Sequence, residues 1–215
     1  MRLTRMALDP QKRRTMLALS YPSIFHGAVE QSLLGKPGQK LWRIDELRGS
    51  TYLMILSEEE PDLTRAVAEL GFDGEAWESR DYSPLLNRIA EGTVWNFRLC
   101  ANPTYSEMRP GQRGKVHAHR TPEQQLRWLF RQGEKNGFCV SPEAVTVTKS
   151  QWYQFGKGNE DGAKHTVRLL AVTYDGILKV TDADLMKQAL KQGIGREKAY
   201  GMGLMTLVGG GGRHG

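Results

Sequence analysis

The order of strand-like and helix-like segments restricts the fold of this chain most strongly. In the first half, the segments with alternating or helical apolar spacing are strand 2–9, helix 9–38 with a break at 20–22, strands 40–47 and 51–58, helix 62–71 and strand 93–103. Residues 72–92 show little periodicity, and we expect them to be mostly loop. The order β-α-β-β-α-β is that of the ferredoxin-like unit.

The second half shows a similar order of segments. After a Gly/Arg/His-rich loop the expected elements are helix 122–137, strand 144–155, a turn-rich loop at 157–164, two strands within 165–182, helix 182–193 and strand 203–208. The first strand of this half is not evident. We therefore predict an α+β protein of two tandem ferredoxin-like (RRM-like) βαββαβ domains, with the expected ranges 1–103 and 104–208 and a flexible tail at 209–215.

Composition excludes several classes of protein. With 39% hydrophobic and 25% charged residues the chain is globular rather than disordered. No apolar run approaches the roughly 18 to 20 residues that span a bilayer, and the basic N-terminal residues precede no apolar signal segment. Cys100 and Cys139 cannot form a disulfide framework. We expect a cytoplasmic protein that does not contact the membrane.

Charge is distributed unevenly along the chain. Residues 1–40 hold seven Lys/Arg and two Asp/Glu, residues 41–107 hold six and thirteen, and residues 108–215 hold seventeen and nine. Ordinary surface charge is one interpretation. A basic beginning and a basic second half around an acidic middle also suit a polyanion bound on one side, with the acidic stretch facing away from it.

The most specific motif is the glycine-rich segment GIGREKAYGMGLMTL at residues 193–207, between a helix and a strand. A tight helix-to-strand connection would explain one or two glycines, but this segment has four. It is neither a Walker loop nor a dinucleotide fingerprint. Exposed backbone N–H groups beside two cations would form a phosphate cradle, made of Gly193, Gly195, Arg196, Lys198, Gly201 and Gly203.

A basic loop at residues 108–120 is a second candidate for contact with RNA phosphates. Its candidate residues are Arg109, Arg113, Lys115, His117, His119 and Arg120, and the same track could continue through Lys149, Lys157, Lys164 and Arg168. A solvated linker is the alternative. Trp152, Tyr153 and Phe155 could stack on an unpaired base or fill the core. His117 and His119 lack neighbouring metal ligands, so we expect no metal.

The glycine-rich segment before the last strand, together with NFRLCANP at 96–103 and the opening strand MRLTRMALDP, resembles the CRISPR repeat-processing endoribonucleases. The similarity is greatest to the CasE branch, the RNA-processing subunit of type I-E Cascade. This resemblance implies metal-independent cleavage of a CRISPR precursor RNA at the base of its repeat stem-loop. It also implies 5′-hydroxyl and 2′,3′-cyclic phosphate ends, retention of the product and binding to other Cascade subunits, without a cofactor.

The same resemblance places His26 at the catalytic histidine of the family. The residues themselves allow this role, because an imidazole can act as acid or base near neutral pH, and His26 follows the apolar stripe position Phe25. A solvated helix histidine is the alternative. Relatives carry a tyrosine three residues earlier, where this chain has Ser23. The second catalytic group is therefore Tyr21, Ser23 or a cation such as Lys36.

Two other functions are compatible with the same sequence. Double ferredoxin-like proteins also serve as non-catalytic RNA-binding subunits of CRISPR effector complexes. A small-molecule enzyme of this fold would instead contain a closed apolar pocket and would show no salt-sensitive affinity for RNA.

Overall fold

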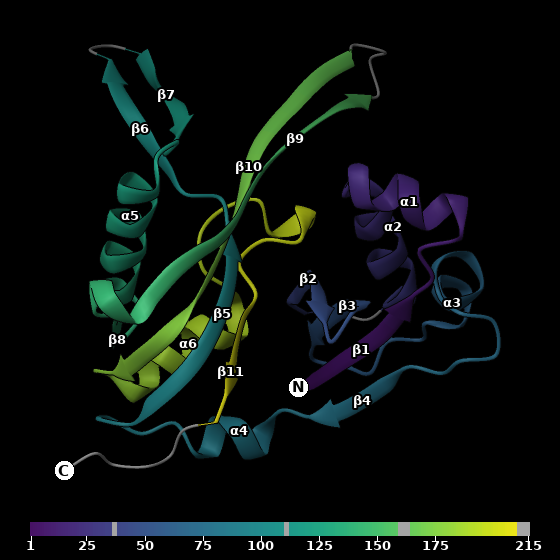
Figure 1. Cartoon of the computed structure of the whole chain (residues 1–215), viewed down its shortest axis with the longest axis horizontal. Coiled ribbons are helices and arrows are strands. Elements are labelled where there is room, and N and C mark those ends of the chain that lie inside the picture. The colour runs from purple at the N-terminus through teal and green to yellow at the C-terminus, as the bar shows by residue number, and fades with distance from the viewer. Residues whose placement is uncertain (36–37, 110–111, 159–163, 210–215) are drawn as a thin grey trace.

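The computed structural model describes residues 1–35, 38–109, 112–158 and 164–209, with 108–109, 112–113, 157–158 and 164–165 described through their backbone alone. Most of the predicted tail lies outside these residues. Two antiparallel sheets with helices packed on them lie side by side (Figure 1). None of the helices in this part of the chain is long and apolar enough to cross a membrane.

The first unit has the ferredoxin-like strand order. Its elements are β1 (Arg2–Leu8), α1 (Arg13–Ser20), α2 (Ser23–Ser32), β2 (Lys40–Leu47), β3 (Ser50–Ser57), α3 (Thr64–Leu70) and β4 (Glu78–Asp81). The sheet runs β2-β3-β1-β4, and its hydrogen-bonded pairs are all antiparallel. This arrangement confirms the predicted fold class for the first half.

Local sequence accounts for most of these elements. The predicted break separates α1 from α2, where Pro22 precedes the first helical residue. Phe25, Val29 and Leu33 are buried against the sheet, as their spacing predicts. Arg48 and Gly49, with φ of 53° and 82°, form the two-residue turn between β2 and β3.

The second unit repeats the topology with additions. Its main elements are β5 (Val94–Ala101), α5 (Pro122–Lys135), β8 (Phe138–Cys139), β9 (Val145–Gly158), β10 (Lys164–Val180), α6 (Ala183–Gln192) and β11 (Met205–Val208). The sheet runs β11-β5-β10-β8, and β9 also pairs with β10. Short additions are α4 (Ser83–Asn87) and the single-turn 3-10 helices η1 (Pro142–Ala144) and η2 (Lys198–Tyr200).

The assignment of strand 93–103 to the first domain is wrong. β5 pairs with β10 and β11, so it is the first strand of the second unit, the strand that the sequence left unidentified. The fourth strand of the first sheet is β4, which pairs with β1 inside the stretch predicted to be loop. β4 is a four-residue polar edge strand, so it shows no apolar alternation to reveal it.

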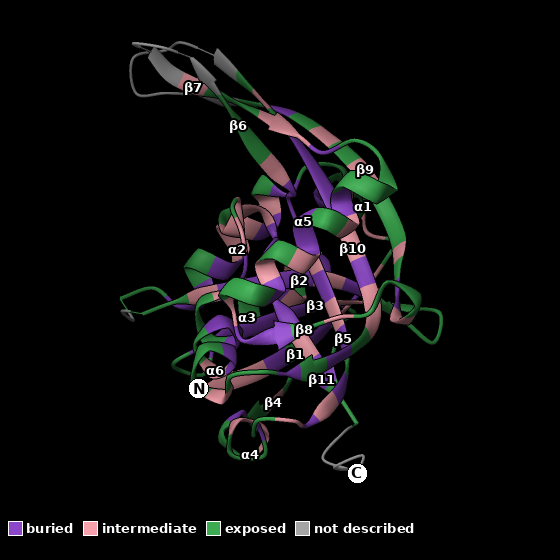
Figure 2. Ribbon diagram, turned by 90° about the vertical axis from the view of Figure 1, so that its left-hand side faces the viewer, coloured by how far each residue is buried: buried purple, intermediate pink, exposed green. Residues whose placement is uncertain are grey.

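Two further segments differ from the expectation. Residues 164–180 form the single strand β10 rather than two strands, because Gly176 lets the backbone of Ala144 and Val145 approach closely instead of turning the chain. The predicted basic loop is largely the hairpin of β6 (Thr104–Arg109) and β7 (Gln112–Ala118). This hairpin projects away from the buried core (Figure 2).

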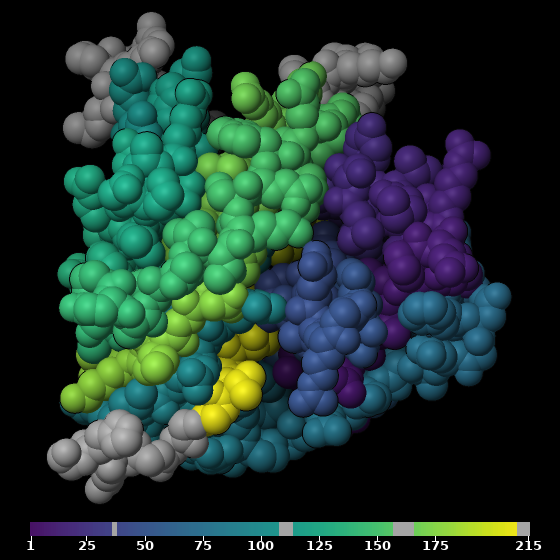
Figure 3. All heavy atoms as spheres, viewed as in Figure 1, coloured from purple at the N-terminus to yellow at the C-terminus, as the bar shows by residue number. Residues whose placement is uncertain are grey.

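Arg43 of β2 joins the two units. The buried guanidinium forms an ion pair with Asp45 at 2.6 Å and donates to the backbone oxygens of Arg98 (3.0 Å) and Leu204 (2.8 Å) in the second sheet. Arg43 and Asp45 also line a groove of about 800 Å³ between the two sheets, which Figure 3 shows beside the C-terminal strand. The largest buried cluster contains residues of both units, so they pack as one body.

Candidate active site and nucleic-acid interface

His26 lies at the edge of the buried face of α2. Its neighbours Phe25 and Val29 are buried in the first core, and this packing leaves the imidazole half-buried and turned toward the second unit. It lines a small pocket of about 240 Å³ together with Lys40, Trp42 and Lys198. The predicted accessible position at the edge of the stripe is therefore confirmed.

The glycine-rich segment forms a loop that is closed on itself and fixed to the second sheet. The backbone N–H of Ile194 donates to the Gly203 oxygen at 2.9 Å, and the N–H of Gly203 donates to the Cys100 oxygen of β5 at 2.7 Å. Asn102, after β5, forms an isolated β-bridge with Arg196. The loop therefore has a defined conformation in which η2 is presented toward α2.

The glycines of this segment allow it to pack closely against the first unit. A Cβ atom on Gly201 would lie 2.6 Å from Trp42 Cζ3, and one on Gly193 would lie 2.7 Å from Leu41 Cδ2. Both residues have positive φ, at 80° and 76°. The segment therefore touches β2 at positions where no side chain fits.

The expected cradle of exposed backbone amides is wrong for three of the four glycines. The N–H groups of Gly193, Gly201 and Gly203 already donate to backbone oxygens within the protein. An amide engaged in this way is a poor phosphate donor, so these glycines act through close packing. The cationic side chains of the segment remain as candidates for phosphate contact.

Side chains from the two units meet at His26. The rings of His26 and Tyr200 lie 6.3 Å apart between centroids, at an angle of 59°. Tyr200 is supported by Phe155 of β9, whose ring centre lies 5.0 Å away. Lys198 lines the same small pocket as His26. His26 and Lys198 therefore share one pocket, and the Tyr200 ring lies beside the imidazole and lines the neighbouring pocket, so the three groups meet in one cleft.

Lys198, Glu30 and Trp42 line the same pocket as His26 and differ in their partners. Burial lowers the pKa of Lys198 from its ordinary value, and among the described residues no carboxylate forms an ion pair with it. Glu30, four residues after His26 on α2, pairs with Lys40, with 2.7 Å between Oε2 and Nζ. The buried Trp42 Nε1 has no hydrogen-bond partner in the structure.

Glu197 separates the two cations of the glycine-rich segment. It has φ of 61°, a conformation unusual for a residue with a side chain. Lys198 after it lines the pocket of His26, whereas Arg196 before it is exposed and lines a different pocket beside Tyr105. The segment therefore presents one cation to each side.

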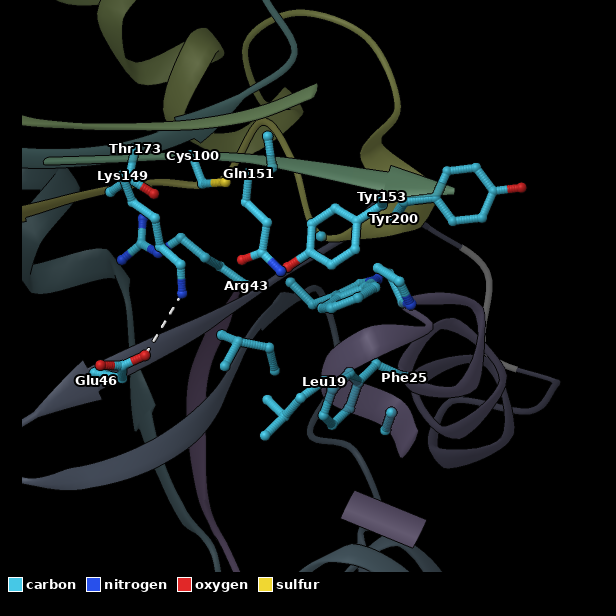
Figure 4. A pocket seen from close by; sticks show the side chains of 16 residues that line it. Leu19, Phe25, Arg43, Glu46, Cys100, Lys149, Gln151, Tyr153, Thr173 and Tyr200 are labelled. Atoms are coloured by element: carbon cyan, nitrogen blue, oxygen red, sulfur yellow. Dashed lines mark ion pairs between the residues drawn. The ribbon is translucent and has the colours of Figure 1, made fainter. Parts of the chain in front are cut away.

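A second pocket, of about 190 Å³, continues from Tyr200 between the two units. Figure 4 shows Tyr153 and Tyr200 at one end of this pocket and Glu46 and Lys149 at the other. Burial raises the pKa of Tyr153 to about 12. Lys149 pairs with Glu46, with 3.5 Å between Nζ and Oε1. The pocket is half-open, so it is not the closed apolar cavity that a small-molecule enzyme would need.

The residues predicted to assist His26 in catalysis are either exposed or outside the described residues. Ser23 is exposed at the start of α2, three residues before His26, and Tyr21 is 43% exposed at the end of α1. Lys36 lies outside the described residues. Tyr200 was not predicted from the sequence, although its position in the glycine-rich segment, between Lys198 and Gly201, could have indicated a place at the site.

The basic candidates lie mainly on two hairpins, β6–β7 and β9–β10, which project from the same end of the molecule (Figure 1). The backbone positions of Arg109 and Arg113 are near the tip of the first, and those of Lys157 and Lys164 are near the tip of the second. Their side chains lie outside the described residues. Lys115 and Arg120 are exposed on and just after β7.

The remaining candidates divide into exposed and structural residues. Arg168 lies over the ring of Trp152, 4.6 Å from its centre, and Trp152 is 41% exposed. Phe155 is buried in the core, so it cannot stack on a base. His119 is buried beside Arg131, and burial followed by the charge of Arg131 lowers its pKa. His117 is half-exposed and faces Glu107 at 3.3 Å.

Comparison with known proteins identifies the family. The model of the family described as "CRISPR associated protein" matches residues 1–208. The chain belongs to this family. A curated member from Thermus thermophilus, the CRISPR-associated endoribonuclease Cse3, is 27% identical over 96% of this chain and 99% of its own length. The CRISPR-associated resemblance predicted from the glycine-rich segment is thereby confirmed.

A second curated relative and a solved structure of Cse3 are also similar to this chain. The Cascade subunit CasE of Escherichia coli K12 is 29% identical over 56% of this chain and 61% of its own length. A solved structure of the endoribonuclease Cse3 bound to a 19-nucleotide RNA has a TM-score of 0.81, with 24% identity over 97% of this chain and all of that chain. This structural similarity confirms the fold.

Proposed function

We propose that this protein is a metal-independent endoribonuclease that cleaves CRISPR precursor RNA at the base of the repeat stem-loop and stays bound to the product. The observation that carries the proposal is the meeting of His26 with Lys198 and Tyr200 across the two units. The relatives support the substrate class, because Cse3 is an endoribonuclease solved with RNA and CasE is a Cascade subunit.

The chemistry needs three groups. The 2′-hydroxyl oxygen attacks the adjacent phosphorus and loses its proton to a base, while the bond from phosphorus to the 5′-oxygen breaks and that oxygen gains a proton from an acid. The products are a 2′,3′-cyclic phosphate and a 5′-hydroxyl. Negative charge that develops on the phosphoryl oxygens needs a cation or hydrogen-bond donors.

The cleft offers one side chain for each task. His26 serves one proton transfer, as acid or base, and the Tyr200 hydroxyl is our first candidate for the other, because its ring faces the imidazole. The Lys198 ammonium, which pairs with no described carboxylate, stabilises the phosphoryl charge. Ser23 and Tyr21 are the alternative candidates for this second proton transfer. A single substitution of each of the three residues shows which one serves it.

The RNA stem is held by the basic residues that lie between and along the two projecting hairpins. Most of its affinity comes from phosphate contacts and therefore falls steeply with salt, and its specificity comes from the shape of the hairpin. After cleavage the protein and its bound RNA join other Cascade subunits. This role places the protein in the cytoplasm, where the transcript is made.

The test incubates the protein with repeat RNA in EDTA and maps both product ends. His26→Ala should slow cleavage by about 100- to 10,000-fold with unchanged RNA affinity. Tyr200→Phe keeps the ring on Phe155 and removes only the hydroxyl, so it should slow cleavage by at least about 10-fold. Tyr21→Phe and Ser23→Ala are the matched controls and should retain the wild-type rate.

Two results would decide against this proposal. If His26→Ala cleaves at the wild-type rate, the imidazole is not the catalyst. If the wild-type protein binds the repeat hairpin but never cleaves it, the protein is a non-catalytic RNA-binding subunit.

A further inference from the structure

A small pocket lies on the opposite side of the glycine-rich segment from His26. It has a volume of about 230 Å³ and lies between the start of β6, α5 and the glycine-rich segment. Its lining comprises Asn102, Thr104, Tyr105, Ser106, Trp128, Gln132, Gly195 and Arg196. Pockets for drug-sized ligands are larger, at about 300 to 1,000 Å³, so this one suits a single flat group.

Asn102, one of the lining residues, has an unsatisfied acceptor. The residue is only 6% exposed, and its Oδ1 has no hydrogen-bond partner in the structure. A buried oxygen of this kind is costly unless it accepts a hydrogen bond. A ligand that brings an N–H donor would satisfy it. The backbone bridge to Arg196 fixes this residue at the pocket wall.

The other walls of the pocket suit an aromatic base with a phosphate. Tyr105 is 45% exposed and is held by ring contacts with His117 at 5.5 Å and His119 at 5.0 Å. Arg196 is exposed at the same pocket, and no carboxylate in the described part of the chain pairs with it. A rigid aromatic ring and a free guanidinium are the groups that hold a stacked base and its phosphate.

Gly195 allows the backbone of the glycine-rich segment to pack closely on Trp128 at the pocket. It has φ of 86°, and a Cβ atom there would lie 3.2 Å from Trp128 Cζ2. The backbone of the segment therefore rests directly on the buried indole. Without this glycine, a side chain would lift the segment and change the distance between Arg196 and Asn102.

We propose that this pocket takes one unpaired nucleotide of the RNA, adjacent to the stem. Its base stacks on Tyr105 and donates an exocyclic N–H to Asn102 Oδ1, and its phosphate contacts Arg196. An adenine or a cytosine carries the required amino group. This proposal rests on the proposed function and adds a second contact beyond the cleavage cleft, with Glu197 as the turn between the two.

The test compares two repeat RNAs, one with its single-stranded flanks and one trimmed to the hairpin, each with a 2′-deoxy nucleotide at the scissile position. Asn102→Leu and Tyr105→Leu should each weaken binding of the flanked RNA by about 5- to 100-fold and leave the trimmed hairpin unaffected. Tyr105→Phe retains the ring and is the matched control. A 2-aminopurine in the flank should lose fluorescence on binding to the wild type only where it enters the pocket.

Equal weakening of both RNAs by Tyr105→Leu would overturn the proposal, and so would no weakening of either. Tyr105 lies on the exposed hairpin, so this variant keeps the test valid even if Asn102→Leu fails to fold. Failure of the proposed function looks different, because the wild-type protein would then either leave the flanked RNA with its native 2′-hydroxyl uncleaved or bind neither RNA in a salt-dependent way.

Discussion

Gly201→Ala should separate catalysis from RNA binding. Gly201 ends η2, directly after Tyr200, and its backbone has φ of 80° and ψ of 24°. A methyl group there would lie 2.6 Å from Trp42 Cζ3 and 2.9 Å from Cη2. Trp42 is 3% exposed within the first core, so the ring has little space into which to move.

The backbone conformation and the packing at Gly201 determine how much the substitution lowers the free energy of unfolding. The left-handed backbone costs a residue with a Cβ about 1 to 2 kcal/mol, and overpacking against a buried ring adds about 1 to 3 kcal/mol. The total of about 2 to 5 kcal/mol is below the typical stability of a domain, about 5 to 15 kcal/mol. The protein therefore stays folded, and the segment relieves the contact by moving away from Trp42.

Such a movement displaces Lys198 and Tyr200 from His26. Displacement of a catalytic group by about 1 Å can cost about 100-fold in rate. We therefore expect single-turnover cleavage of repeat RNA to fall about 100-fold. RNA affinity should change much less, because the two basic hairpins are untouched.

Gly92→Ala is the matched control. Gly92 has nearly the same φ, 81°, but no atom lies within 4 Å of a Cβ atom placed there. It should lower the free energy of unfolding by about 1 to 2 kcal/mol and leave cleavage unchanged. A Gly201→Ala protein that cleaves at the Gly92→Ala rate would refute the contact with Trp42 as the determinant of the site.

Three other predictions follow from the structure. Arg43→Met should cost about 3 to 5 kcal/mol in urea denaturation because it leaves the buried Asp45 carboxylate with only the longer ion pair to Arg98, at 3.8 Å, and R43M with D45L should recover most of that loss. Since burial lowers the folded-state pKa of His119, the unfolded chain binds more protons, so the free energy of unfolding should fall as pH drops below about 6.5; H119Q should flatten this dependence in denaturation curves. Because burial lowers the pKa of Lys198, affinity for uncleavable RNA should already decline at a pH below the ordinary lysine value of about 10.4, more steeply in the wild type than in K198R; parallel declines would contradict its phosphate role.

Elements with strong local signals could be predicted from the sequence. Thr121 and Gln124 form the capping box that begins α5, and Asp182 caps α6, both close to the predicted starts. His26 was proposed through the family resemblance, and its place next to Phe25 in the apolar stripe predicted the partly buried position that the structure shows. These features depend on neighbours along the chain, so the sequence contains them directly.

The features that could not be predicted depend on pairing between distant residues. The sequence of β5 shows that it is a strand, but its choice between two sheets depends on which edges remain free after folding. The contact of Tyr200 with His26 requires both units to be docked. The number of glycines in the segment was evident in the sequence, but the packing role of Gly193 and Gly201 depends on Leu41 and Trp42, which no local pattern connects to them.

The packing of the glycine-rich segment on β2 also constrains how this chain can vary. Gly193 and Gly201 belong to the second unit, yet the space they require is defined by Leu41 and Trp42 of the first. A chimaera that exchanges one unit for that of a distant relative would therefore lose its cleft unless both sides of this contact were transferred together. The two halves, although each has its own sheet, therefore depend on each other for the shape of the cleft.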